Sequence, residues 1–177
     1  MCSSDLFFQY DSSRLAVGSA LGTATITFTD ASDALLDYTI GGASGRKSIT
    51  RQLYGAPDMA DHGNHADMWW GGSAQTGWGV ALMQQYSSIF AVWFTYDASG
   101  SPIWFVLPAG SWTANDTYEG RAFRTASSSW IGVAYDPSRL QTFDVGTMRL
   151  RFGGSSPSLD YTVDGRSGTL TLSHQPF

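Results

Sequence analysis

Residues 145–174 read VGTMRLRFGGSSPSLDYTVDGRSGTLTLSH, and this stretch decides the fold. Apolar and polar side chains alternate along residues 145–153, 159–164 and 168–174. A period of two is typical of a β-strand that has one buried face and one face in water. The pair Asp164-Gly165 between the last two runs favours a tight hairpin turn. The stretch therefore predicts three antiparallel strands in series.

The same pattern occurs earlier in the chain, because residues 10–54 align with residues 135–177 across small gaps. The identical pairs include Arg14/Arg139, Leu15/Leu140, Gly22/Gly146, Leu35/Leu159, Tyr38/Tyr161 and Gly42/Gly165. Three matching strands are expected near residues 22–29, 35–40 and 46–52. What lies between the two copies has no earlier partner. We therefore expect 1–54 to be the C-terminal half of a truncated first repeat, 55–66 a linker and 67–177 a complete second repeat of a longer repeat protein.

Five further strands are predicted before the alternating stretch, at residues 67–70, 77–85, 88–97, 102–110 and 117–125. Turn residues separate them, as in the Asp97-Ala98-Ser99-Gly100 loop. The chain is therefore expected to be all-β, an antiparallel meander of about eight strands that forms a barrel or a sandwich, plus the strands of the partial repeat. The repeat boundary can also be drawn differently, so that the strands of 1–54 and those of 67–127 form one folding unit. Asp136-Pro137 predicts one short helical turn.

Composition limits the classes of partner. Charged residues make up only 14% of the 177 residues, the net charge is −5, and no Lys/Arg cluster occurs, so we expect no nucleic-acid partner. No run approaches the roughly 20 apolar residues of a membrane helix, so no membrane span is expected. The single cysteine, Cys2, excludes an intramolecular disulfide. Cys2 is either a lipoprotein anchor or a terminal cysteine without a role, and any export signal is expected upstream.

Three motifs carry a family resemblance. They are MWWGGSAQTGWGVAL at 68–82, IFAVWFTYDASGSPIWFVL at 89–107, and the later DPSR and DYTVDGRSG segments. Together they resemble a β-rich repeated domain of secreted or surface proteins of Gram-negative bacteria. The resemblance implies an exported accessory module, secreted or at the cell surface or in the periplasm, without an established chemistry. It also implies neighbouring repeats or attached domains of the same protein as partners.

Aromatic residues supply the candidate binding site. Segments 89–96 and 103–107 are apolar at successive positions, so both faces of these strands need a cover. The candidate ligand-binding residues are Trp69, Trp70, Trp78, Trp93, Tyr96 and Trp104. Flat aromatic faces suit a glycan or an attached domain. Alternatively, Trp93, Tyr96 and Trp104 line the cavity of a lipocalin-like or avidin-like barrel that holds a small apolar ligand. The competing interpretation is that these side chains only pack the core.

Catalysis and metal binding are the poorer interpretations. His62 and His65 lie among Asp58, Asp61 and Asp67, a set that could ligate a metal but matches no known spacing. The chain has no GxSxG elbow, and Glu119 is its only glutamate, so neither a nucleophile nor a carboxylate pair can be nominated. We expect a non-catalytic binding or structural module with no catalytic residue, no metal and no cofactor. A module attached to a secreted hydrolase stays an alternative.

Overall fold

The computed structural model describes residues 4–11 and 16–175, with side chains from residue 19 onward. Cys2, Arg14 and Leu15 lie outside the described residues. Contacts divide the chain into two compact units. Unit 1 comprises Met1–Leu53 and Ser127–Leu140, and unit 2 comprises Tyr54–Ala126 and Gln141–Phe177. The segment 127–140, which the repeat alignment places within the second copy, therefore groups with the first.

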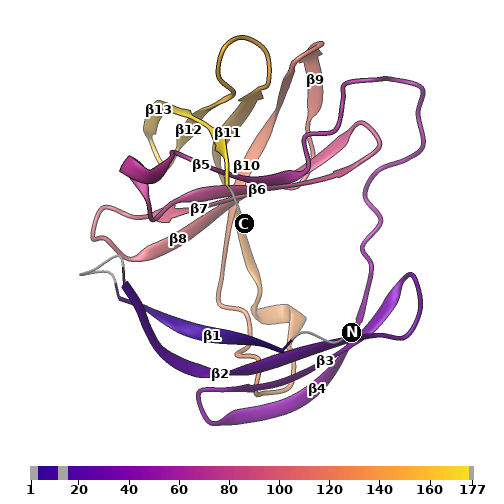
Figure 1. Cartoon of the computed structure of the whole chain (residues 1–177), viewed down its shortest axis with the longest axis vertical. Helices are drawn as coiled ribbons and strands as arrows, with labels where there is room; N and C mark the ends of the chain where they lie inside the picture. The colour runs from indigo at the N-terminus through magenta and orange to yellow at the C-terminus, as the bar shows by residue number, and fades with distance from the viewer. Residues whose placement is uncertain (1–3, 12–15, 176–177) are drawn as a thin grey trace. The chain divides into compact units, whose positions relative to one another are not determined.

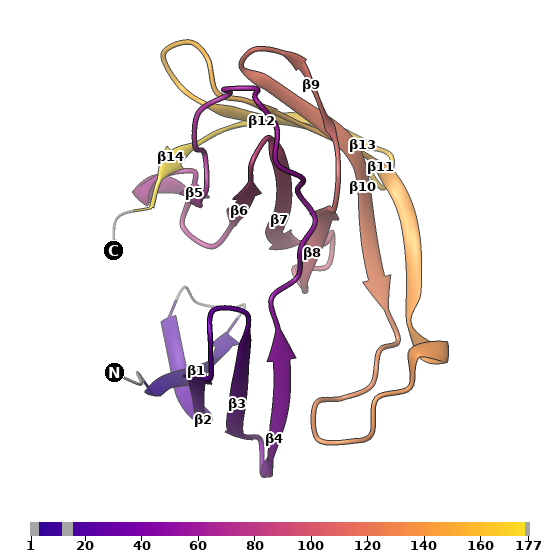
Figure 2. The same ribbon diagram turned by 90° about the vertical axis from the view of Figure 1, so that its right-hand side faces the viewer.

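Unit 2 is a nearly closed antiparallel barrel. Its strands are β5 (Asp67–Trp70), β6 (Gly79–Gln85), β7 (Ser88–Tyr96), β8 (Pro102–Leu107), β9 (Ser111–Ala114), β10 (Thr117–Ala126), β11 (Gln141–Arg151), β12 (Ser158–Val163), β13 (Arg166–Thr171) and β14 (Ser173–His174). The order in the sheet is β13-β12-β11-β10-β8-β7-β6-β5-β14, and β9 pairs with β10 off this path. Figures 1 and 2 show β5–β8 on one side of this barrel and β10–β13 on the other.

A short seam brings the two ends of this sheet together. Only Leu172 separates β13 from β14, and β14 pairs with β5, Ser173 opposite Trp70 and His174 opposite Trp69. The His174 Nδ1 lies 2.7 Å from Asp67 Oδ2, next to the seam. Since β13 pairs with β12 and β14 with β5, the chain closes the sheet by passing from one edge to the other. Closure removes the unpaired edges that an open sheet exposes.

The core of unit 2 lies inside the barrel. Its buried apolar side chains come from both sides: Val80, Leu82, Ile89, Ala91, Trp93, Phe105 and Leu107 from β6–β8, and Tyr118, Ala122, Met148, Leu150, Leu159 and Val163 from β10–β12. On β11, Met148 and Leu150 are buried while Arg149 and Arg151 are exposed. The two-residue alternation in the sequence therefore positions each strand with its apolar face inward.

Unit 1 is a four-stranded antiparallel sheet with the segment 127–140. Its strands are β1 (Ser4–Asp11), β2 (Ala16–Phe28), β3 (Asp33–Ile40) and β4 (Ala43–Thr50), in the order β1-β2-β3-β4 (Figure 1). The Tyr38 hydroxyl donates to the Ile131 carbonyl at 2.8 Å. Within 127–140, the 3₁₀ turn η2 (Pro137–Arg139) begins after Asp136, whose side chain accepts from the Ser138 amide at 3.0 Å. The predicted helical turn is confirmed.

The sheet of unit 1 matches β10–β13 strand by strand. The β1–β2 pair shifts register between Phe7 and Phe8, opposite Gly22, and the β10–β11 pair shifts between Ala122 and Phe123, opposite Gly146. Both hairpins that follow turn on two positive-φ residues, Gly41-Gly42 and Asp164-Gly165, the backbone of a type I′ turn. In the next pair of strands, Tyr38 lies opposite Gly45 and Tyr161 opposite Gly168. The two segments therefore share a bulge, a turn and a register.

The register also corrects one aligned pair. Ile26 faces Leu36 across β2–β3, and Leu150 faces Leu159 across β11–β12. The counterpart of Leu159 is therefore Leu36, and the sequence pairing of Leu35 with Leu159 is wrong by one residue. The gap belongs in the loop before β3, because a loop absorbs an extra residue without turning a strand over.

The all-β class and the barrel of about eight main strands are confirmed. The predicted strands at 67–70, 77–85, 88–97, 102–110 and 117–125, those near 22–29, 35–40 and 46–52, and those of the alternating stretch are all present, most of them with shifted ends. The strands β1 and β9 and the first four residues of β11 were not predicted. β9 is only four residues long and does not alternate, and β11 opens with the exposed residues Gln141–Asp144.

Candidate functional site

A partly open cavity of about 380 Å³ is lined by residues of the unit 2 barrel, next to the β7–β8 and β12–β13 turns. Its apolar wall comes from both sides of the barrel and comprises Trp78, Trp93, Tyr96, Ile103, Phe105, Tyr161, Val163 and Leu170. Its polar wall comprises Thr95, Asp97, Asp164 and Arg166. The volume falls at the small end of the range for ligand pockets, and an apolar wall with a few polar groups is their usual composition.

Trp93 is the most informative residue of this wall. Its side chain extends from β7 and is only 5% exposed. The indole ring packs with Phe105 at 5.4 Å and with Tyr161 at 4.7 Å between ring centroids. Its Nε1 is buried, and no described residue accepts a hydrogen bond from it. Leaving a buried donor unpaired costs about 1–3 kcal/mol. A ligand that displaces the side chains covering Nε1 and offers an acceptor would remove that cost.

Fixed turns hold the charged residues of the cavity wall. Asp97 Oδ1 accepts from the Ser99 amide at 2.8 Å and from the Ser101 amide at 3.0 Å. The Ser99 hydroxyl also donates to Asp97. This hydrogen bond, followed by those from the amides, holds the pKa of Asp97 below its ordinary value. In the β12–β13 turn, Asp164 Oδ2 lies 3.9 Å from Nε of Arg124 on β10. The cavity thus combines an aromatic interior with charged turns.

The structure brings together three of the six predicted ligand-binding residues. Trp78, Trp93 and Tyr96 line the cavity. Trp69 belongs to the core instead, and its Nε1 donates to the His65 carbonyl at 3.1 Å. Trp70 donates to the His174 carbonyl at 3.2 Å, next to the seam.

Trp104 does not line the cavity. It lies on the outer face of β8, 49% exposed, directly opposite the exposed Phe94 of β7. Met83 on β6 is also exposed, while Tyr54 packs against Phe90 at 5.8 Å and covers part of the same face. The second apolar face that the sequence predicted for these strands is therefore present, and part of it is open to solvent.

The cavity residues of β12 and β13 were missed by sequence reasoning. Tyr161, Val163 and Leu170 lie far along the chain from Trp93, and barrel closure alone brings them to the same cavity. The available signal was their alternation, which places each of them on the inner face of its strand. Alternation alone does not give the order of the strands in the barrel, so it could not predict that these residues lie near Trp93.

The two histidines of segment 55–66 serve as packing residues. The His62 ring stacks on Trp112 with centroids 4.1 Å apart, and the His65 ring stacks on Phe152 at 3.6 Å. Burial lowers the pKa of His65, and its hydrogen bond with the His62 carbonyl offsets this only in part. Within the described ranges, no three His, Cys, Asp or Glu side chains are grouped to hold a metal.

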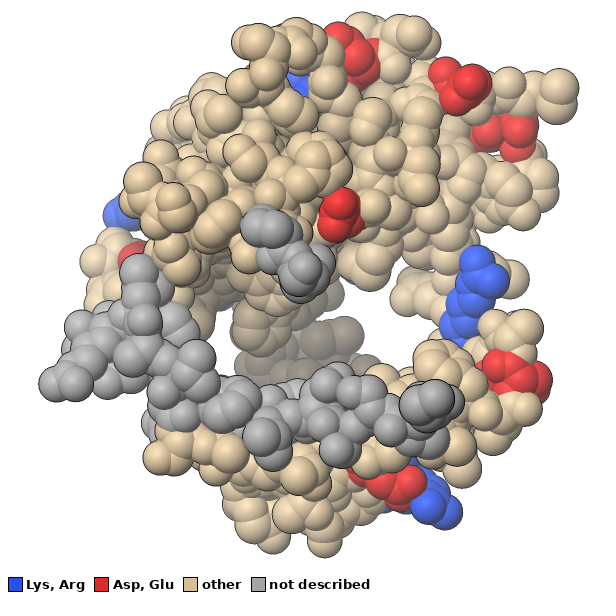
Figure 3. Space-filling view, in the orientation of Figure 1, with Lys and Arg blue, Asp and Glu red and all other residues tan. Residues whose placement is uncertain are grey.

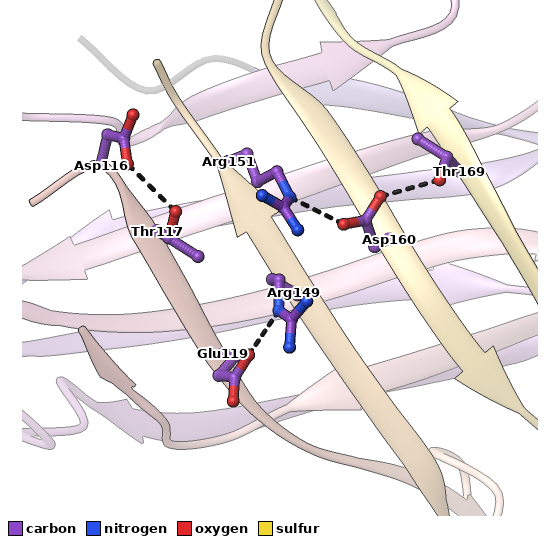
Figure 4. A network of polar contacts seen from close by, with 7 residues as sticks. All are labelled: Asp116, Thr117, Glu119, Arg149, Arg151, Asp160 and Thr169. Carbon is purple, nitrogen blue, oxygen red and sulfur yellow. Dashed lines mark hydrogen bonds and ion pairs between the residues drawn. The ribbon is translucent and has the colours of Figure 1, made fainter. Parts of the chain in front are cut away.

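Paired charges occupy the outer face of β10–β13. Figure 4 shows Arg149 beside Glu119, and Asp160 between Arg151 and Thr169. Burial raises the pKa of Asp160, but hydrogen bonds from Arg151 and Thr169 outweigh it and leave the pKa below its ordinary value. Glu119, Arg149 and Asp160 of this set line a cavity of about 430 Å³. Because each of these charges already has a partner, this face is a weaker candidate for ligand binding than the aromatic cavity.

Comparisons with protein-family models, curated proteins and solved structures find no match to this chain. Among the residues that the structure describes, no helix has the length and apolarity needed to cross a membrane. On the face shown in Figure 3, the charged side chains that are described lie singly or in small groups. The geometry of the cavity is therefore the evidence for the candidate site.

Proposed function

We propose that the protein is a non-catalytic binding module whose unit 2 barrel holds a small, largely apolar ligand. Trp93, which lines the cavity and whose buried Nε1 has no acceptor among the described residues, carries this proposal. Packing alone explains why an indole is buried, but it does not explain a donor left without an acceptor. A ligand with an aromatic or aliphatic body and one carbonyl-type acceptor would match both features of the wall.

A matched pair of probes tests the acceptor requirement. Acetophenone and α-methylstyrene have similar shapes, but only the first has a carbonyl oxygen. Acetophenone is expected to bind about fivefold more tightly, because one neutral hydrogen bond contributes about 1 kcal/mol. Binding is measured by NMR, following the indole Nε1–H signal of Trp93 and the two dissociation constants.

Two variants give the test its controls. Trp93→Phe should bring the ratio of the two dissociation constants to about one, and comparing the probes within one variant cancels any loss of packing. Trp104→Ala, on the outer face, should leave the ratio as it is in the parent. The proposal fails if neither probe moves the Trp93 signal, or if the ratio survives in Trp93→Phe.

The exposed aromatic pair on the outer face supports a second candidate function, binding of a glycan. Phe94 and Trp104 lie opposite each other on β7 and β8, and both are exposed. Adjacent flat rings can stack on the C–H faces of successive sugars. Trp104→Ala should then abolish glycan-array binding of the parent without changing its melting temperature. Retention of all array signals by this variant would count against the candidate.

The setting proposed for this module is an exported bacterial repeat protein, with neighbouring repeats or attached domains as partners. The motifs at 68–82 and 89–107 support it through their resemblance to secreted and surface proteins. Fractionation of the source cells tests it, since recovery of the protein from the cytoplasm alone would contradict export.

A further inference from the structure

We propose that the inner face of β1–β4 is the docking surface for a four-stranded sheet of the β5–β8 type, which closes unit 1 into a second barrel. The inner face is the one that holds Ile26, Tyr38 and Ile49. This interaction is independent of the ligand in unit 2. It is argued from the match between the two sheets and from the exposure of their equivalent residues.

Equivalent positions identify the face. Ile26 faces Leu36 as Leu150 faces Leu159, so Ile26 corresponds to Leu150. Ala34 in unit 1 corresponds to Pro157 in unit 2. Ile49 pairs with Ala34, and the Leu172 amide donates to the Pro157 carbonyl, so Ile49 corresponds to Leu172. Leu150 and Leu172 point into the unit 2 core. Their counterparts in unit 1 therefore occupy the face that a barrel would bury.

Exposure differs sharply between the two sheets. Ile26 is 43% exposed and Leu150 is fully buried. Ile49 is 37% exposed, whereas its counterpart Leu172 is 2% exposed. Phe28 is also exposed, while its counterpart Phe152 packs against the unit 2 core. The same pattern of apolar side chains is thus buried in unit 2, whereas in unit 1 Ala24, Ala34 and Tyr38 are buried but Ile26, Phe28 and Ile49 are exposed.

The cover in unit 2 defines the occupant. Its core side chains on the side facing β10–β13 come from the strands β6, β7 and β8, with Val80, Ile89, Trp93 and Leu107 among them. A sheet that presents large apolar and aromatic side chains in this alternation would bury Ile26, Phe28 and Ile49. Burial of each such side chain contributes roughly 1.5–3 kcal/mol.

A second copy of this chain supplies a β5–β8 segment only by uncovering its own β10–β13 strands. In the part of the chain that the structure describes, the β10–β13 kind of strand set occurs twice, as β1–β4 and as β10–β13, and the β5–β8 set occurs once. If two copies exchange these strand sets, each chain still has one set of the β10–β13 kind without a β5–β8 partner. The proposed occupant is an additional segment of the β5–β8 kind, paired with β1 in the way that β8 pairs with β10.

The segment 127–140 holds part of this surface in the present structure. The Tyr38 hydroxyl donates to Ile131 within it, whereas the equivalent Tyr161 packs on Trp93 of β7. An arriving sheet of the β5–β8 kind would place its own tryptophan against Tyr38. We therefore expect docking to release the contact between Tyr38 and Ile131.

The experiment fuses a second copy of residues 54–116 ahead of β1 in the full chain. Cys2 is replaced by Ser throughout, and Ile26→Cys or Leu150→Cys supplies one thiol for labelling. In the unfused chain, Ile26→Cys should react at least tenfold faster than Leu150→Cys. In the fusion, the Ile26→Cys rate should fall at least tenfold, and amide exchange in β2–β4 should slow.

A matched fusion provides the control. It carries Val80→Asp and Leu107→Asp in the added copy only, so that the second sheet cannot present an apolar face. The Ile26→Cys thiol should stay reactive in this protein. The proposal is overturned if the thiol reacts equally fast in the fusion and the unfused chain, if the added segment stays unfolded, or if the Asp-bearing copy protects the thiol as well.

Discussion

The sheet of β1–β4 and the sheet of β10–β13 share one design and differ in what covers them. Both have a bulge at a glycine, a two-residue turn with positive φ and a tyrosine opposite a glycine. Within unit 2, β10–β13 meets the aromatic strands β6–β8 across a core, whereas Ile26 and Phe28 of β2 are exposed. The comparison teaches that short-range signals specify strand register, whereas burial depends on the partner sheet.

The largest expected difference between the two sheets is the cost of truncating equivalent core positions. Leu150→Ala should lower the unfolding free energy of unit 2 by about 3 kcal/mol, because it leaves a cavity in a packed interior. Ile26→Ala should lower that of unit 1 by only about 1 kcal/mol, because Ile26 keeps much of its contact with solvent. Urea unfolding followed by tryptophan fluorescence measures the first, and amide exchange in β2–β4 measures the second. Equal losses at the two sites would break the comparison.

A smaller difference is expected at the two tyrosines. Tyr38→Phe removes the hydrogen bond to Ile131 and should cost about 1 kcal/mol in unit 1. Tyr161→Phe keeps the ring against Trp93 and should change unit 2 stability by less than about 0.5 kcal/mol. Amide exchange in 127–140 should speed up in Tyr38→Phe only. A faster exchange of this segment in both variants would mean that the tyrosines do not act separately.

The smallest expected effect is a loss of stability at low pH, which should occur in unit 2 and not in unit 1. All three histidines, His62, His65 and His174, belong to unit 2. Because the folded pKa of His65 lies below 6.5, the unfolded chain binds a proton more readily. The stability that His65 contributes is therefore complete above pH 6.5 and is lost as the pH falls from 6.5 through the lowered pKa.

Unfolding curves at pH 7 and pH 5.5 measure this effect. The stability of unit 2 should fall at the lower pH, and His65→Phe, which keeps a ring on Phe152, should reduce the fall. Amide exchange in β2–β4, corrected for its intrinsic pH dependence, should show no change. A fall of equal size in His65→Phe would remove His65 as the cause.

Much of the fold could be predicted because alternation and turn residues are local signals. The run of Met148, Leu150 and inward-facing Leu159 was enough to predict both strands and their inner faces. The strand β1 was not predicted, because segment 4–11 (SDLFFQYD) lacks a two-residue alternation, and its match to β10 becomes visible only through the shared bulge.

Only the residues that the β5–β8 side of the barrel contributes to the candidate site could be predicted from the sequence. Trp78, Trp93 and Tyr96 lie in the aromatic motifs, and composition alone made them candidates. Composition could not distinguish Trp93, which faces the cavity, from Trp104, which faces solvent. That distinction follows from strand position, because residues of opposite parity on paired strands face opposite sides.

The two-residue strand β14 has a consequence for the order in which the protein acquires its structure during synthesis. Unit 2 is sealed where Ser173 and His174 meet Trp70 and Trp69, so its first and last strands must find each other across a loop of about one hundred residues. A nascent chain therefore holds β5 with an open edge until almost the whole unit has left the ribosome. Sealing at so distant a pairing makes it a late and slow step of folding, and the interval before it is when a growing chain is most exposed to wrong strand partners.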